Sequence, residues 1–124
     1  MSDKTKAERQ YHKAVDFYAA GKLKKAVKWI RKAAGLGYPD AQYNLGAMYA
    51  NGKGVEQSYI EAAVWYHKAA DQGHARAQYN LGGMYFRGHG FTQSTIEAAK
   101  WFRLAEAQSH VEAQSRLKEL DAAK

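Results

Sequence analysis

The amino-acid sequence predicts an all-α fold, a right-handed α-solenoid of helix-turn-helix repeats. The strongest observation is self-similarity: the stretch AQYNLG occurs at 41–46 and again at 77–82, and residues 41–76 and 77–112 are identical at 20 of 36 positions without a gap. Alanine is frequent between charged residues and proline occurs only once, which favours helix. Because one helix pair cannot bury its own apolar face, such units stack into one continuous core.

The repeat divides a single domain into four segments. Residues 39–74 and 75–110 form two full repeats, and residues 7–38 form a looser first unit in which the loop between the helices shrinks to Gly21. Residues 111–124 supply one more helix of the first type, whose polar residues predict a cap over the end of the array. We therefore expect about three helix pairs plus a C-terminal capping helix.

Each full repeat carries its own start and stop signals. Asp40 can cap a first helix that runs from Ala41 to about Asn51, and the glycines of NGKG at 51–54 then end it. The second helix is expected to begin at Ser58. There SYIE fits a capping box, in which the serine oxygen and the glutamate satisfy each other's end amides, and STIE repeats the box one unit later.

Helical spacing predicts the buried faces. Leu45, Met48 and Tyr49 form the apolar face of a first helix, while Gly46 and Gly82 let neighbouring helices approach closely. Tryptophan recurs at one repeat position, which predicts core packing rather than an aromatic ladder. The tryptophans and the predicted apolar faces of the second helices comprise Trp29, Ile60, Ala63, Trp65, Tyr66, Ile96, Ala99, Trp101 and Phe102.

The sequence lacks the features of several protein classes. It has no cysteine, which excludes a disulfide scaffold and thiolate metal sites, and no apolar run near the roughly 18 residues of a membrane helix. The histidines show no metal-ligand spacing, and His74 and His110 recur at equivalent helix-end turns, which predicts a capping role. SRLK at 115–118 matches a serine-enzyme signature without its partner motifs. We expect a cytoplasmic, monomeric protein with no metal, no cofactor and no catalytic residue.

The net charge of +7 is concentrated in the first third of the chain. Residues 1–38 hold ten Lys or Arg against three acidic residues, whereas the remainder holds nine of each sign. One helical face there carries Lys24, Lys28, Arg31 and Lys32. Such a ridge can bind phosphates or meet an acidic protein or a membrane surface. It lacks interleaved exposed aromatic residues and a glycine-rich phosphate loop, so a solvated face is the simpler interpretation.

Residues 41–75, AQYNLGAMYANGKGVEQSYIEAAVWYHKAADQGHA, resemble the Sel-1-like repeat, a relative of the tetratricopeptide repeat, and residues 77–111 match almost as well. The first unit looks more like a plain tetratricopeptide repeat. The resemblance spans roughly residues 7–120. It implies a curved stack whose first helices line a concave groove. It also implies an adaptor function, because proteins of this family mostly hold other proteins together and are generally not enzymes. The cysteine-rich bacterial branch is set aside, because this chain has no cysteine.

By that resemblance, the partner-binding residues occupy outward positions of the first helices. Tyrosine and arginine are good anchors, because they combine a large contact area with a polar tip. The asparagines can either hold a peptide backbone or bond between helices. Phe86, Arg87 and His89 break the repeat, and such departures can carry the specificity of one array. The candidate groove residues are Tyr11, His12, Val15, Tyr18, Tyr43, Asn44, Ala47, Asn51, Tyr79, Asn80, Gly83, Phe86, Arg87 and Arg116.

The predicted function is a non-catalytic adaptor that binds a peptide or a partner-protein segment in the concave groove. A second hypothesis is that the basic first unit binds nucleic acid or another anionic surface. Nucleic acid is less favoured as a partner than a protein or peptide. A third is an immunity or inhibitor protein that blocks a toxin or an enzyme. Binding through the basic unit should weaken steeply with salt, whereas groove binding should fail on substitution of Tyr79 or Arg87.

Overall fold

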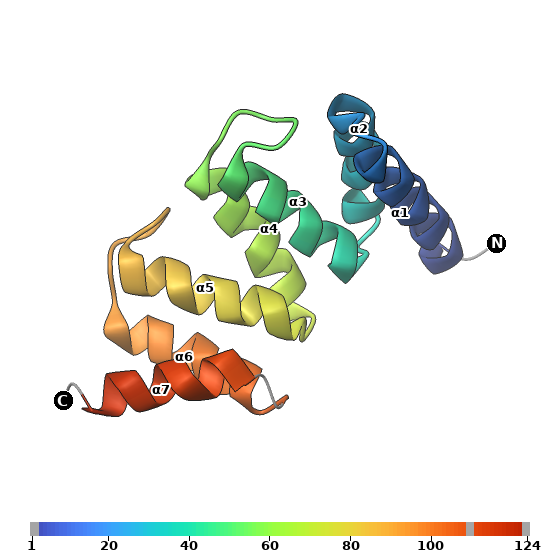
Figure 1. The fold of residues 1–124 in the computed structure, drawn as a ribbon. Coiled ribbons are helices and arrows are strands. Elements are labelled where there is room, and N and C mark those ends of the chain that lie inside the picture. Colours follow the sequence, from blue (N-terminus) through green and yellow to red (C-terminus); the bar gives the residue numbers. More distant parts are fainter. Residues whose placement is uncertain (1–2, 109–110, 123–124) are drawn as a thin grey trace.

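The computed structural model describes residues 3–108 and 111–122, and within them it contains seven helices and no strand. Consecutive helices pair as α1 with α2, α3 with α4 and α5 with α6, and α7 packs on α6. The stack follows a curved path from the N-terminal pair to α7 (Figure 1). The predicted three pairs plus one helix are confirmed. The helices are α1 (Asp3–Ala19), α2 (Leu23–Gly35), α3 (Pro39–Asn51), α4 (Tyr59–Asp71), α5 (Ala75–Arg87), α6 (Thr95–Glu106) and α7 (Val111–Ala122).

The boundaries of α3 are only partly those predicted. The helix begins at Pro39 with Tyr38 as its N-cap, so the prediction that Asp40 caps it is wrong. Proline suits the first helical position, because the amide that it lacks would have no intrahelical partner there. The predicted stop is confirmed: α3 ends at Asn51, and Gly52 follows in the left-handed conformation, with φ of 67°.

Ser58 caps α4, but only half of the predicted capping box forms. Its Oγ accepts a hydrogen bond from the amide of Glu61 at 3.1 Å. The reciprocal bond is not made, because the amide of Ser58 donates instead to the carbonyl of Tyr49 at 2.9 Å. The same arrangement recurs one unit later, where Ser94 caps α6. Each serine therefore fixes the start of one helix and ties its loop to the end of the preceding one.

His74 has a capping role, but it caps the start of α5 and not the end of α4 as predicted, since the C-cap of α4 is Gln72. Its Nδ1 accepts a hydrogen bond from the amide of Ala77 at 3.2 Å, and its Nε2 lies 3.0 Å from Oδ1 of Asp40. Because Nδ1 accepts, Nε2 carries the proton and donates to the carboxylate. The imidazole thus links the starts of two successive first helices. The equivalent His110 lies outside the described residues.

Two glycines let the helices of each full repeat approach closely, as predicted. A Cβ placed on Gly46 would lie 2.7 Å from the ring of Tyr66, and one placed on Gly82 would lie 2.5 Å from the ring of Phe102. Both rings are buried, so neither has room to withdraw. These contacts set the spacing between α3 and α4 and between α5 and α6.

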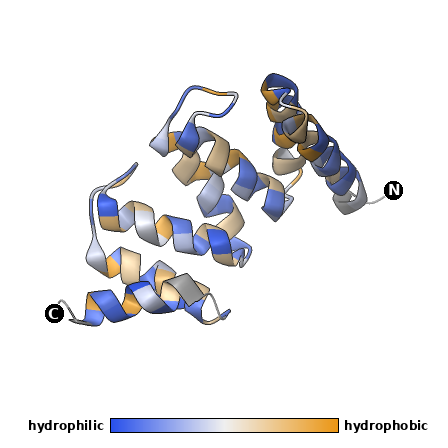
Figure 2. Ribbon diagram, viewed as in Figure 1, coloured by the Kyte–Doolittle hydropathy of each residue, from blue (hydrophilic) through white to orange (hydrophobic). Residues whose placement is uncertain are grey.

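The core runs through all the helix pairs. Trp101 is buried, and Trp29 and Trp65 are partly buried and pack against the core, so the predicted packing of the tryptophans is confirmed. A second cluster joins α6 to α7, where Ala113 and Leu117 are buried near Phe102. Each helix carries both hydrophobic and hydrophilic residues along its length (Figure 2). On α7 the exposed residues include Ser115, Lys118 and Glu119.

Two predicted core residues face solvent instead. Ile60 is 69% exposed and Ile96 is 81% exposed, so their assignment to apolar faces is wrong. The buried face of α4 begins at Ala62, and two residues correspond to roughly 200° around a helix, which places Ile60 on the opposite side. The same offset separates Ile96 from the buried Ala98 on α6.

The glutamine of the repeated stretch is an unexpected core residue. Gln42 is only 5% exposed. Its Nε2 donates to the carbonyl of Ala34, at the end of the preceding pair, at 3.2 Å. Its Oε1 accepts a hydrogen bond from Nε2 of Gln72, from the end of its own unit, at 2.8 Å. We call this arrangement the glutamine bridge.

The glutamine bridge recurs one unit later at Gln78, which is also 5% exposed. Its Nε2 donates to the carbonyl of Ala70 at 3.1 Å, and its Oε1 accepts from Nε2 of Gln108 at 3.0 Å. Gln114 occupies the corresponding position on α7 and is exposed. The two bridges therefore satisfy buried amides while joining each full unit to its predecessor.

Candidate functional site

An apolar hollow lies on the side of the first helices, between α1 and α3. Its volume is about 310 Å³. Val15 and Tyr18, which line it, are 42% and 46% exposed. Polar atoms are contributed by Tyr11, Asn44, Asn51 and Lys53, and the remaining walls are Ala14, Val15, Tyr18, Ala26, Ile30, Ala47 and Met48.

A cationic hollow of about 420 Å³ lies beyond it, between α3 and α5, and reaches α7. Its charged residues are Arg87 and Arg116, and no Asp or Glu lines either hollow among the residues that the structure describes. Asn51, at the end of α3, lines both hollows. The two hollows together are called the groove. The rest of the cationic hollow comprises Ala50, Tyr59, Tyr66, Tyr79, Asn80, Gly83, Met84, Phe86, His89 and Phe102.

Most of the candidate groove residues line one of the hollows. His12 and Tyr43 line neither. His12 is exposed on α1, and Tyr43 stacks on the ring of His74, with ring centroids 4.8 Å apart. The apolar hollow takes Tyr11, Val15, Tyr18, Asn44, Ala47 and Asn51, and the cationic hollow takes Asn51, Tyr79, Asn80, Gly83, Phe86, Arg87 and Arg116.

Both asparagines of the repeated stretch bond between helices. Nδ2 of Asn44 donates to the hydroxyl of Tyr11 at 2.8 Å, and the side chain of Asn80 bonds with the hydroxyl of Tyr66. Burial raises the pKa of Tyr66 to about 12, although the hydrogen bond with Asn80 lowers it. This hydroxyl is therefore protonated at neutral pH and braces the groove rather than acting as a base.

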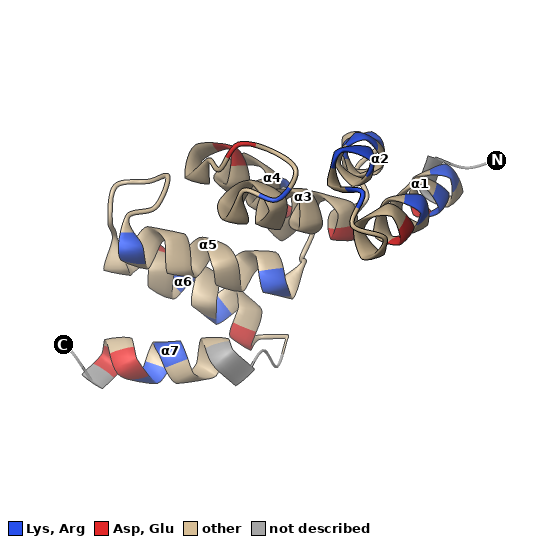
Figure 3. Ribbon diagram, turned by 45° about the horizontal axis from the view of Figure 1, so that its top comes forward, with Lys and Arg blue, Asp and Glu red and all other residues tan. Residues whose placement is uncertain are grey.

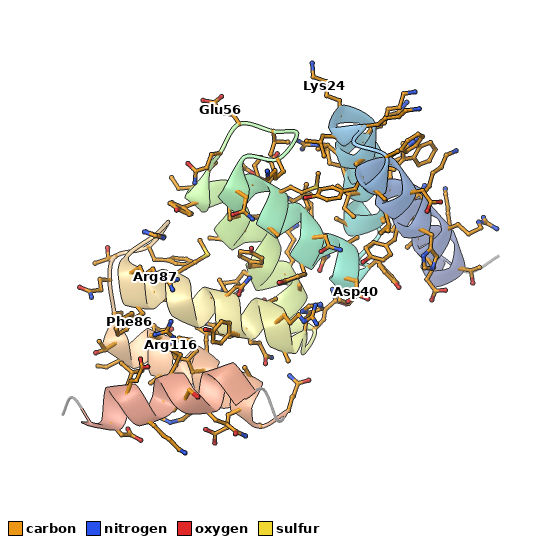
Figure 4. The ribbon with its side chains drawn as sticks, viewed as in Figure 1. Lys24, Asp40, Glu56, Phe86, Arg87 and Arg116 are labelled. Carbon is orange, nitrogen blue, oxygen red and sulfur yellow. The ribbon has the colours of Figure 1, made fainter. Side chains whose placement is uncertain are left out.

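The two arginines of the cationic hollow differ in their surroundings. Arg116 bonds with the hydroxyl of Tyr79 and lies 3.1 Å from Oε2 of Glu119, and these contacts raise its pKa further. Arg87 lies over Gly83, where an added Cβ would be 3.0 Å from Nη1. Phe86, Arg87 and Arg116 gather on the α5–α7 part of the molecule, whereas Lys24 and Glu56 project away from it (Figure 4).

Sequence reasoning missed the lining contributed by second helices. Tyr59 and Tyr66 of α4 and Phe102 of α6 reach the cationic hollow. Tyr59 stacks on His89, with ring centroids 4.2 Å apart. The departure of His89 from the repeat was the available signal for this contact. The sequence held no such signal for the second-helix residues, because their positions in the repeat are equally compatible with burial in the core.

The predicted basic ridge lies outside the groove. Lys24, Lys28 and Lys32 are exposed on α2, where Lys and Arg are dense together with those of α1 (Figure 3). Arg31, however, has a structural partner: its Nη2 donates to the hydroxyl of Tyr49 at 2.6 Å and so ties α2 to α3.

A partly buried aromatic ring that packs against the core also lies among these lysines. Trp29 is partly exposed. Nζ of Lys13 lies 4.2 Å from its ring centroid, Nζ of Lys32 lies 4.4 Å away and Nζ of Lys28 lies 5.9 Å away. Ammonium groups at these distances are attracted to the ring face, so α1 and α2 form one basic surface around Trp29.

No group of three or more His, Asp or Glu side chains that could hold a metal ion occurs in the described part of the chain. No helix in the same part is both long and apolar enough to cross a membrane. The chemistry that the groove offers is that of hydrogen-bond donors, aromatic rings and positive charge.

Comparison with known proteins adds sequence and structural relatives. The family model of the Sel1 repeat matches residues 22–38, 39–74 and 75–110. A Sel1 repeat protein from Oxalobacter formigenes is 34% identical, with a TM-score of 0.85 over 91% of this chain and 88% of that one. A protective antigen of uropathogenic Escherichia coli with an SLR fold, c5321, is 41% identical, with a TM-score of 0.84 over 87% of this chain and 24% of that one.

A more distant structural relative is the cysteine-rich protein B of Helicobacter pylori, which is 25% identical, with a TM-score of 0.78 over 93% of this chain and 95% of that one. The present chain has the related fold without any cysteine. A search of curated proteins found no match. The repeat match over most of the chain and the 34% identity to a Sel1 repeat protein of similar length agree with the paired helices described above. The chain belongs to the Sel1 repeat family.

Proposed function

We propose that this protein is a non-catalytic interaction module that binds a peptide or an extended segment of a partner protein in the groove. The observation that carries the proposal is that two neighbouring hollows, both lined largely by the first helices, share Asn51 as a lining residue. Sel1 repeat proteins generally serve as protein-interaction scaffolds and are typically not enzymes, which supports it. A groove of this size buries little of a partner, so we expect micromolar affinity.

The test is a pull-down from a lysate of the source organism, with nuclease and moderate salt. The variant Tyr18→Ala/Arg87→Ala truncates one exposed side chain of each hollow, and about tenfold lower recovery of a specific protein is expected. Val64→Ala/Arg103→Ala is the matched control, because both residues are exposed on second helices outside the groove. Circular dichroism first establishes that all variants are equally helical. Equal recovery by both double variants would contradict binding in the groove.

The basic surface around Trp29 supports a second candidate function, binding to nucleic acid or another anionic surface. Three lysines surround a partly exposed ring there. Fluorescence anisotropy of a labelled single-stranded DNA, measured from low to moderate salt, tests it. Loss of three phosphate contacts in Lys13→Glu/Lys28→Glu/Lys32→Glu should reduce the log–log salt slope by about 2. The control Lys68→Glu/Lys100→Glu/Lys118→Glu carries the same net charge, and equal behaviour of the two would exclude the basic surface.

A further inference from the structure

The lining of the groove changes in character along its length, and this change indicates the chemistry of its ligand. The hollow between α1 and α3 is largely apolar, whereas the hollow beyond Asn51 carries two arginines. Neither is lined by an acidic residue among those described. We propose that the groove binds an extended acidic segment of a partner protein, with an apolar side chain in the apolar hollow and an Asp or Glu side chain in the cationic hollow. The inference rests on the proposed function of the groove.

Arg87 is the residue that selects the acidic group. Its guanidinium makes no hydrogen bond or ion pair with any residue that the structure describes, and it lies over Gly83 in the lining of the cationic hollow. The preceding repeat has Ala47 and Asn51 at the positions of Gly83 and Arg87. Thus glycine provides space for the guanidinium in the one repeat that carries it. A guanidinium presents five donors and binds a carboxylate with two parallel hydrogen bonds.

Arg116 supplies a second, weaker contact from α7. Its contacts with Tyr79 and Glu119 hold the guanidinium in place, and Glu119 compensates part of its charge. An incoming carboxylate therefore enters a hollow that is lined by two arginines, of which Arg116 is oriented by its partners and Arg87 is not paired with a described acidic residue. The positive lining also disfavours a basic segment, because like charges repel most strongly in a partly desolvated hollow.

The apolar hollow defines the other half of the ligand. Val15 and Tyr18 leave apolar surface exposed at its rim, while Ile30 and Met48 lie within its walls. Burial of one large aliphatic or aromatic side chain there is favourable in proportion to the apolar area removed from water. Lys53 also lines this hollow and adds positive charge at the start of the loop that follows α3.

The experiment uses synthetic peptides of defined composition and amide chemical shifts of the isotopically labelled protein. Each peptide is acetylated and amidated and carries one leucine separated from two glutamates by a variable Gly/Ser spacer. Matched peptides replace the glutamates by glutamines, or the leucine by alanine. A neutral peptide with a free C-terminal carboxylate and inorganic phosphate complete the set. The protein variants are Arg87→Gln and the control Arg103→Gln, which alters an exposed arginine outside the groove.

The expected result is that the glutamate peptides shift signals of both hollows, and that Arg87→Gln or the glutamine peptides weaken binding about tenfold. Arg103→Gln should bind like the wild type. Binding that is unaffected by glutamine peptides or by Arg87→Gln overturns this inference but leaves groove binding intact. Preference for the free C-terminus or for phosphate over the glutamate peptides also overturns it. If no peptide shifts the signals of either hollow, both the inference and the proposed groove function fail.

Discussion

Replacing Gly82 by alanine is expected to lower the free energy of unfolding by about 2 kcal/mol, because the added methyl group has no room. A Cβ there would lie 2.5 Å from the ring of Phe102, which is itself 2% exposed. Alanine normally stabilises a helix interior by about 1 kcal/mol relative to glycine, so the helix preference opposes the steric effect. We expect the steric clash to outweigh the helix preference, because the ring cannot move without disturbing the core.

Gly83→Ala is the matched control for Gly82→Ala, because it makes the same chemical change one residue further along α5. There the nearest atom is the flexible end of Arg87, 3.0 Å from the added Cβ. The helix preference should therefore dominate, and the stability should stay equal or rise by up to about 1 kcal/mol. Urea unfolding followed by circular dichroism measures both variants. A stabilised Gly82→Ala variant would show that the two helices have room to separate.

Replacing Gln78 by alanine is expected to lower the free energy of unfolding by about 2–3 kcal/mol. The change removes two hydrogen bonds of the glutamine bridge, each of which contributes about 1 kcal/mol. It also leaves a cavity where the Cγ methylene and the carboxamide were buried. The carbonyl of Ala70 keeps its bond from the amide of Gly73, and Gln108 is exposed and can turn to water. These compensations keep the loss below that of an isolated buried polar group.

Two further variants separate the causes of the Gln78 effect. Gln78→Leu restores most of the volume without the hydrogen bonds, so it isolates the polar contribution. Gln114→Ala changes the exposed glutamine at the same repeat position on α7 and should alter stability by less than about 0.5 kcal/mol. Thermal and urea unfolding give the values. If Gln114→Ala were as destabilising as Gln78→Ala, the burial of the bridge would not be the cause.

The repeat architecture could be predicted because self-similarity at a fixed period is itself the signature of stacked units. The identical stretches at 41–46 and 77–82 located the first helices, and the serines at 58 and 94 located the starts of the second ones. These features act within a few residues of the chain. Local signals of this kind are readable without knowledge of the packing.

Features that depend on helix rotation and on competing partners could not be predicted in the same way. Ile60 resembles a core residue because its side chain is large and apolar, yet it lies on the opposite face of α4 from Ala62. The amide of Ser58 could donate to the side chain of Glu61 in a capping box, but it donates to the carbonyl of Tyr49 instead. Both outcomes are decided by the position of a neighbouring element, which one helix taken alone does not contain.

The groove illustrates the same limit. Its first-helix lining was implied by the resemblance to the Sel-1-like repeat, and the departure of Arg87 from the repeat was visible in the sequence. The glutamine bridge was missed, although Gln42 and Gln78 recur at the repeat spacing, because a glutamine is ordinarily assigned to the surface. Only the contact with the preceding pair shows that these amides are buried and satisfied.

The glutamine bridge bears on how an array of this kind evolves in length. Every bond of the bridge joins a unit either to itself or to its immediate predecessor, at positions separated by the same number of residues in both full repeats. A gene duplication that copies residues 39–74 as a block reproduces every donor and acceptor in register. Copying only part of a unit would leave a buried amide without its hydrogen-bond partner. Whole-unit duplication is thus the tolerated step, and c5321, of which this chain covers 24%, is a longer protein with the SLR fold.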